Sequence, residues 1–131
     1  MSPEELLYAE THEWAFVADE DGAKVATVGI SAHALEQLTD LVYMDLPAVG
    51  SAVAAGESFG EVESVKATSD LYSPDDGEVI AVNDTLPDNL EILGSDPYVA
   101  GWIMKVKISD EGSLSKLMDF AAYETQCNEE G

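Results

Sequence analysis

Short runs in which apolar and polar residues alternate dominate the chain, and such runs predict β-strands joined by turns. The clearest run is 102–108, where apolar and charged residues alternate over the second half. Asp19-Glu20-Asp21-Gly22 has the composition of a hairpin turn. The expected strands run from residue 11 to the turn at 19–22, over 25–30, over 41–46 and over 102–108, with a hairpin over about 56–82.

Helical spacing is confined to short segments. Residues 2–5 resemble a capped helix start, and Ser31 is placed to cap a helix over 32–39. A C-terminal helix over about 113–125 is expected to bury one apolar face, formed by Leu114, Leu117, Met118, Ala121 and Ala122. Residues 83–98 are polar and turn-rich, which predicts a long surface loop. Many short strands and a terminal helix together predict a small sandwich or flattened barrel.

The composition supports one domain over residues 1–131, because 46% apolar residues suffice for a core, in which Trp14 and Trp102 are expected. The formal net charge of −22 excludes binding to nucleic acid or to an anionic membrane surface. The charge fits docking on basic partners, for which Glu10, Glu13 and Glu57 are candidate residues, but it equally fits high solubility alone. We expect a monomer.

The single cysteine, Cys127, cannot form an internal disulfide and is expected to be a free thiol in a reducing compartment. No apolar run approaches the roughly 18 residues of a membrane span. The N-terminal residues are acidic and lack the basic region of a targeting segment. These features predict a cytoplasmic protein, or a mitochondrial-matrix protein whose presequence has been removed.

Lys66 is one of only five lysines in a chain that has no arginine and 27 acidic residues. It lies midway between two glycine-punctuated, strand-like segments, with Gly56 ten residues before it and Gly77 eleven residues after it. This near-symmetry predicts that Lys66 lies at the tip of a β-hairpin, where another enzyme can reach its amine. A lysine presented in this way suits covalent attachment of a prosthetic group.

The motif around this lysine resembles the lipoyl-attachment segment of the H protein of the glycine cleavage system. The motif consists of Glu63-Ser64-Val65-Lys66-Ala67-Thr68-Ser69-Asp70, followed by Tyr72-Ser73-Pro74 and Gly77-Glu78-Val79. Further matches occur in the same order along the chain, at residues 12–14, 26–30, 49–50, 59–63, 96–98 and 101–102. The resemblance implies a barrel-sandwich hybrid fold, as in lipoyl domains, with short helices and a C-terminal helix.

The resemblance also implies a carrier protein, rather than an enzyme, with lipoic acid attached as an amide to Lys66. In that family the arm takes the aminomethyl group of glycine from the pyridoxal-phosphate decarboxylase to the tetrahydrofolate-dependent aminomethyltransferase. Dihydrolipoamide dehydrogenase then reoxidises the dithiol, and a lipoate ligase or lipoyl transferase attaches the group in the first place. The chemistry belongs to the cofactor and the partner enzymes.

Five further residues match family positions with a role. Glu63 matches the acid by which ligases recognise the hairpin, and Gly50 and Gly77 match glycines that shape it. The loaded arm of the family folds into a surface cleft. Glu13 and Asp70 fall where acids contact the aminomethyl nitrogen, which is cationic when protonated.

The chain departs from the family pattern at two places. Asp75-Asp76 precedes Gly77, where the family more often has an apolar or small residue and then serine, so Asp75 is expected to face a partner. Gln37 stands where some members have histidine, which leaves open any protonation role at that position.

Other carriers and sites fit the residues less well. Biotinyl carriers share the hairpin but usually have methionine on both sides of the lysine, where this chain has Val65 and Ala67. Phosphopantetheine needs a serine on a helical bundle, and His12 and His33 lack metal-ligand spacing. Two alternatives remain open: an H-like lipoyl donor in protein lipoylation, and an interaction module whose lysine is never modified.

Overall fold

A computed structural model of the chain describes residues 6–9, 12–20, 22–31, 34, 41–65, 68–86, 89–95, 101–110, 112 and 117–130. The predictions for residues 2–5, for most of the helix over 32–39 and for Glu10, His33, Gln37 and Lys66 lie outside these residues. Within the described ranges, no helix is long and apolar enough to cross a membrane.

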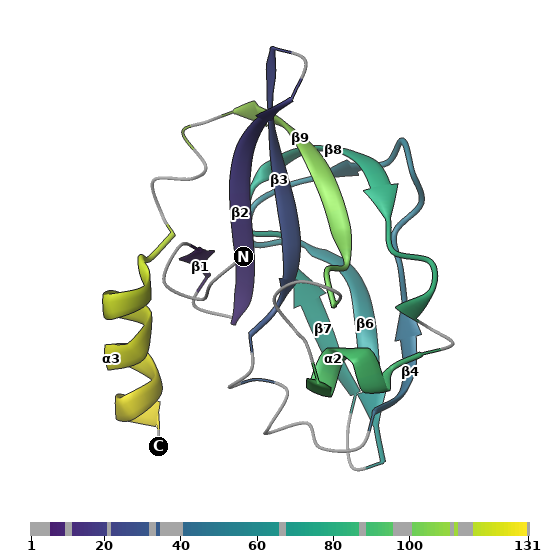
Figure 1. Ribbon diagram of the computed structural model, residues 1–131, viewed down its shortest axis with the longest axis vertical. Coiled ribbons are helices and arrows are strands. Elements are labelled where there is room, and N and C mark those ends of the chain that lie inside the picture. The colour runs from purple at the N-terminus through teal and green to yellow at the C-terminus, as the bar shows by residue number, and fades with distance from the viewer. Residues whose placement is uncertain are drawn as a thin grey trace.

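The described strands form two antiparallel sheets (Figure 1). The six-stranded sheet has the order β1-β2-β3-β9-β8-β5, and the three-stranded sheet has the order β4-β6-β7. The strands of the larger sheet are β1 (Leu7–Tyr8), β2 (Glu13–Glu20), β3 (Ala23–Ile30), β5 (Ala52–Val53), β8 (Asp76–Val82) and β9 (Met104–Asp110). The strands of the smaller sheet are β4 (Leu41–Asp45), β6 (Ser58–Ser64) and β7 (Thr68–Tyr72).

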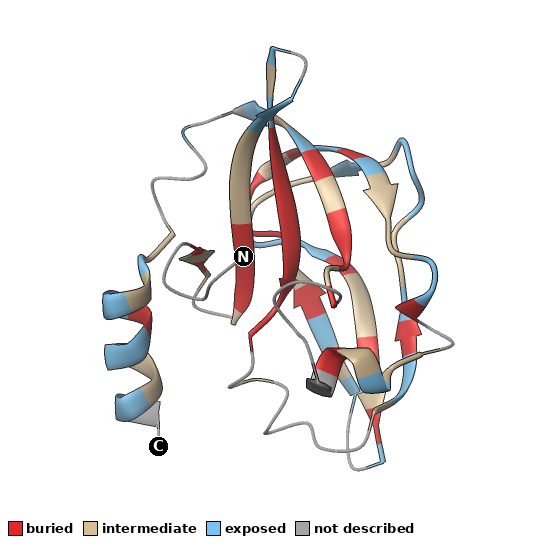
Figure 2. Ribbon diagram, viewed as in Figure 1, coloured by how far each residue is buried: buried red, intermediate tan, exposed pale blue. Residues whose placement is uncertain are grey.

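The main core lies between the two sheets. Val28 and Met104 from the larger sheet and Val62 from the smaller one are fully buried and belong to one apolar cluster. Figure 2 shows this burial running along β3 and β9. Each such side chain contributes about 1.5–3 kcal/mol by leaving water, so the two faces of alternating strands are sufficient to hold the sheets together.

A second, aromatic cluster fixes the C-terminal helix α3 (Phe120–Glu130) beside β1. Tyr8 and Tyr123 stack with ring centroids 4.3 Å apart, and buried Trp14 packs in the same cluster. The indole nitrogen of Trp14 donates to the Ile30 carbonyl at 3.2 Å, so its polar atom is satisfied in the core. The prediction that Trp14 is a core residue is confirmed.

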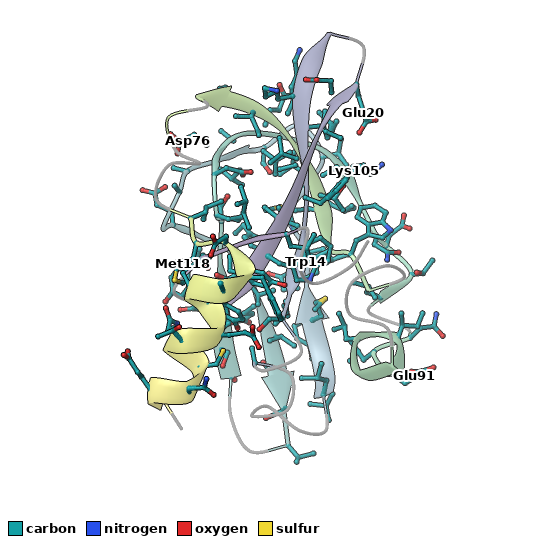
Figure 3. All side chains as sticks on the ribbon, turned by 60° about the vertical axis from the view of Figure 1, so that its left-hand side comes forward. Trp14, Glu20, Asp76, Glu91, Lys105 and Met118 are labelled. Carbon is teal, nitrogen blue, oxygen red and sulfur yellow. The ribbon has the colours of Figure 1, made fainter. Side chains whose placement is uncertain are left out.

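The predicted C-terminal helix over 113–125 differs from the structure within the described residues, and Leu114 of its predicted apolar face lies outside them. Met118 pairs with Tyr8 in a β-bridge, and Figure 3 shows Met118 just ahead of the helix. The Asp119 carboxylate accepts the Ala122 amide at 2.9 Å, which is an N-cap, so α3 begins at residue 120, whereas Leu117 and Met118 pack against the core from outside the helix. Ala121 and Ala122 are consequently exposed, and Tyr123 is the buried residue of the first turn.

The segment 83–98 is also not the surface loop that its polar composition predicts. It contains the short helix α2 (Glu91–Ser95), and Leu86 and Leu93 are fully buried in the main core. The nearby strand β9 begins at Met104, so Trp102 lies ahead of it and is half-buried under the Lys105 ammonium, 5.8 Å from the ring centroid. A few leucines spaced through a polar segment are enough to bind it to the core.

Candidate attachment site

A hairpin is present, but it is shorter than the predicted range 56–82: β6 and β7 form it, whereas β8 pairs with β5 and β9 in the larger sheet. The pairing of the two strands ends at Glu63 opposite Thr68, and residues 65–67 connect the end of β6 at Ser64 to the start of β7 at Thr68. Lys66 belongs to this connection by its place in the chain, although it lies outside the described residues. Val65, its neighbour in the chain, is 64% exposed, so the described start of the connection is open to solvent.

Glu63 lies on β6 between two neighbours, with Tyr43 of β4 opposite it on one side and Thr68 on the other. Its side chain is half-buried, and it is three residues before Lys66 in the chain. An acid in this position is held on a paired strand and lies close to the start of the connection. The placement fits recognition of the hairpin by another protein.

The two predicted glycines lie away from the hairpin connection. Gly50 has a φ of +94° in the turn between β4 and β5, and its amide donates to the Val79 carbonyl at 2.7 Å. Gly77 is on β8, where an added Cβ would lie 2.2 Å from the Lys107 carbonyl oxygen of β9. Gly50 therefore allows a left-handed turn, and Gly77 allows a close approach of two backbones. Gly50 and Gly77 thus shape the turn before β5 and the β8–β9 pairing, outside the β6–β7 hairpin.

Glu13 is a buried acid that joins the two sheets. It begins β2 in the larger sheet, has 2% exposure, and accepts the Tyr72 amide of β7 at 3.2 Å through Oε2. The neighbouring Ser73 amide donates to the backbone carbonyl of Glu57 at 2.9 Å. A carboxylate at this depth needs such donors, and it cannot belong to the solvated docking face predicted for Glu10, Glu13 and Glu57.

Asp70 is exposed and lies two residues before Tyr72 on β7. Two residues of extended strand span about 7 Å, so the structure brings Glu13 close to the strand segment that carries Asp70. One acid is thus held in the interior and the other in water, and both lie close to the same short strand segment.

Asp75 does not face a partner, contrary to the prediction, because it is fully buried between β7 and β8. Its Oδ2 has no hydrogen-bond partner in the described part of the chain, and the Ser73 hydroxyl lies 3.5 Å from its Oδ1. Burial raises the pKa of Asp75 from 3.8 to about 7; the hydrogen bond from Ser73 lowers this pKa, and the charge of Asp76 raises it further.

A polar chain behind Glu13 was not predicted. The Tyr123 hydroxyl of α3 lies 2.6 Å from His12 Nδ1 and 2.5 Å from Ser31 Oγ, and His12 has a φ of +79°. These hydrogen bonds connect α3 to His12, the residue that precedes Glu13. The sequence does not indicate this contact, because Tyr123 is 92 residues from Ser31 and 111 residues from His12.

The chain is similar in sequence to proteins of one family over almost its whole length. Residues 6–130 match the family described as glycine cleavage H-protein. The chain is 61% identical over 129 residues to the glycine cleavage system H protein of Rhodopirellula baltica, covering 98% of this chain and 97% of that protein. It is 50% identical over 128 residues to the H protein of an Escherichia coli strain, with the same coverage.

A solved structure agrees with the sequence relatives. The crystal structure of a glycine cleavage system H protein from Mycobacterium marinum superposes with a TM-score of 0.87 at 38% identity, covering 97% of this chain and 99% of that one. The barrel-sandwich class expected from the resemblance is confirmed, and so is the expected part in glycine cleavage. The chain belongs to the glycine cleavage H-protein family.

Proposed function

We propose that this protein carries lipoic acid as an amide on Lys66 and passes the aminomethyl group of glycine between the enzymes of the glycine cleavage system. The observation that supports this most directly is the β6–β7 hairpin, whose connection over residues 65–67 contains Lys66 and whose described residue, Val65, is exposed. The residues around the lysine fit a tethered group. The β6–β7 pairing holds both ends of the connection in place, and no paired strand of the described part of the chain would restrict the attached arm.

The bound group would supply a disulfide–dithiol pair that accepts the aminomethyl group at the decarboxylase and yields it at the aminomethyltransferase, with reoxidation by dihydrolipoamide dehydrogenase. The protein itself contributes no catalytic group to these steps. It tethers the arm, so that each partner meets the reactive end at a high effective concentration. A lipoate ligase or lipoyl transferase attaches the group. We further propose that the chain acts as a monomer, and that it works in the cytoplasm of a bacterium, since relatives such as those of Rhodopirellula baltica and Escherichia coli come from bacteria.

Glu13 and Asp70 are proposed to hold the aminomethyl nitrogen of the loaded arm when that nitrogen is protonated. Glu13 is fixed by the Tyr72 amide, whereas Asp70 is free to approach from water. Hydrogen bonds between charged groups are worth about 1.5–3 kcal/mol each, and a buried carboxylate gives the larger part of this because little solvent screens it. The pair therefore delays the release of the group into water.

Replacing Glu13 with glutamine and Asp70 with asparagine is expected to shorten the lifetime of the loaded group at least tenfold, because both charges are lost while both shapes are kept. The measurement is the rate at which the isolated, loaded carrier releases its aminomethyl group. A variant with Glu78→Gln and Asp84→Asn is the control, since these two exposed acids remove the same charge elsewhere. An unchanged lifetime in the first variant would contradict the role of the pair.

The direct test of the proposed function is the intact mass of the chain after incubation with a lipoate ligase, lipoate and ATP, followed by peptide mapping. We expect one lipoyl amide in the peptide that contains Lys66. The lipoylated protein should then support exchange of the glycine carboxyl carbon with bicarbonate in the presence of the decarboxylase. Lipoylation without this exchange would favour the lipoyl-donor role, and no lipoylation would leave the unmodified interaction module.

A further inference from the structure

The outer face of the β4–β6–β7 sheet carries two rows of side chains next to the attachment hairpin. The strand register defines the rows as Tyr43–Glu63–Thr68 and Asp45–Glu61–Asp70. All six residues are exposed or half-buried, whereas Met44, Val62 and Leu71 point to the opposite side and are buried. We call these six residues, with Val42 and Val65, the hairpin face.

The corner of the hairpin face at the end of β6, where the chain leads to Lys66, is apolar. Val42, Tyr43 and Val65 are 56%, 48% and 64% exposed. A β-bulge between Leu41 and Tyr43 makes this possible, because the extra residue lets both Val42 and Tyr43 meet solvent. Apolar groups gathered at the surface and rimmed by charges are typical of a contact with another protein, and tyrosine is among the residues that contribute most to such contacts.

The rest of the hairpin face is acidic. Asp45, Glu61 and Asp70 form one continuous row across the three strands, and Glu63 lies in the next row. The face therefore fits a partner with an apolar pocket for Tyr43 and basic residues around it. Such complementary charge raises the rate of encounter and fixes the orientation of the two proteins.

We propose that the occupant of the hairpin face is the enzyme that attaches the lipoyl group, an inference that rests on the proposed function of Lys66. That enzyme must bring an activated carboxyl group to bond-forming distance, about 3–3.5 Å, of the lysine amine. The wall of its active site must then cover the residues beside the connection. Enzymes that act on the dithiolane work at the far end of a long arm and have no such need.

The test is the initial rate of lipoylation by a lipoate ligase, measured by intact mass at several concentrations of the unmodified chain. Tyr43→Lys is expected to lower kcat/KM at least tenfold, mainly by raising KM, while Tyr43→Phe stays within twofold of the wild type. Ile80→Lys is the matched control, since Ile80 is 40% exposed on β8 of the other sheet and should change the rate less than twofold. Glu61→Gln is expected to weaken the salt dependence of KM.

The failures of this inference and of the proposed function are distinguishable. If the wild-type chain takes up no lipoyl group, both the proposed function and the docking of the attaching enzyme are overturned. A Tyr43→Lys variant modified at the wild-type rate overturns docking on the hairpin face and leaves attachment at Lys66 intact. Fully lipoylated Tyr43→Lys should react with dihydrolipoamide dehydrogenase within twofold of the wild type, and an equal loss in both assays would overturn the attaching enzyme as the occupant.

Discussion

Replacing Lys66 with arginine is expected to abolish lipoylation and, with it, all glycine-dependent activity of the reconstituted system. Arginine keeps the positive charge but has no amine that can be acylated, because its guanidinium stays protonated with a pKa above about 12. The hairpin itself should be unaffected, since its pairing at Glu63 and Thr68 does not involve the lysine. The loss is thus expected to be complete, with no change in the temperature of unfolding. Intact mass and carbon exchange measure the two effects.

The other lysines provide matched controls for this experiment. Lys24 pairs with Asp19 at 3.2 Å on the first hairpin, and Lys107 is exposed in the middle of β9. Neither lies in a connection between two strands. Lys24→Arg and Lys107→Arg should be lipoylated like the wild type. A Lys66→Arg chain that still gains a lipoyl group would show that attachment occurs elsewhere.

Replacing Asp75 with valine is expected to stabilise the protein at pH 8 by about 2–4 kcal/mol. Because burial raises the pKa of Asp75 from 3.8 to about 7, the carboxyl loses its proton more readily in the unfolded chain than in the folded one. Stability contributed by this group is therefore lost as the pH rises from about 4 to about 7 and stays lost above that. Three pKa units correspond to roughly 4 kcal/mol as an upper value. Valine has a similar size and no charge to bury.

The measurement is the free energy of unfolding in urea, for both chains, from pH 4 to pH 8. The difference between them isolates Asp75 from the many other acids, and it should grow with pH up to about 7. Glu78→Gln, which removes one exposed charge on β8, should show no such growth. A difference that is constant with pH would mean that Asp75 is ionised in the folded protein at acidic pH.

The strands and the hairpin could be predicted because their signal is local. Alternation with period two correctly predicts a strand over residues 25–30, which lies within β3, and the turn residues at 19–22 mark the reversal between β2 and β3. The C-terminal helix could not be placed in the same way. Met118 fits a helical stripe as well as a strand, and what decides is its pairing with Tyr8, at the other end of the chain.

The site could be predicted only in part for the same reason. The motif around Lys66 is continuous in sequence, so its location in a hairpin follows from its neighbours. Glu13 and Asp75 are polar and would be placed on the surface by composition alone, yet both are buried. The environment of Glu13 depends on a backbone amide 59 residues away, and that of Asp75 depends on packing that no local pattern contains.

The contact between Glu13 and the Tyr72 amide also bears on self-association. Among the described strands, β7 ends the smaller sheet, and an edge strand with unpaired amides is a template on which another molecule can add a strand. Glu13 already occupies one of these amides, and Asp70 adds a charge nearby on the same strand. A second copy laid along β7 would meet one amide that is already paired with Glu13, and the exposed negative charge of Asp70. The acids proposed to receive a cationic amine thereby also protect the open edge of the sandwich against aggregation.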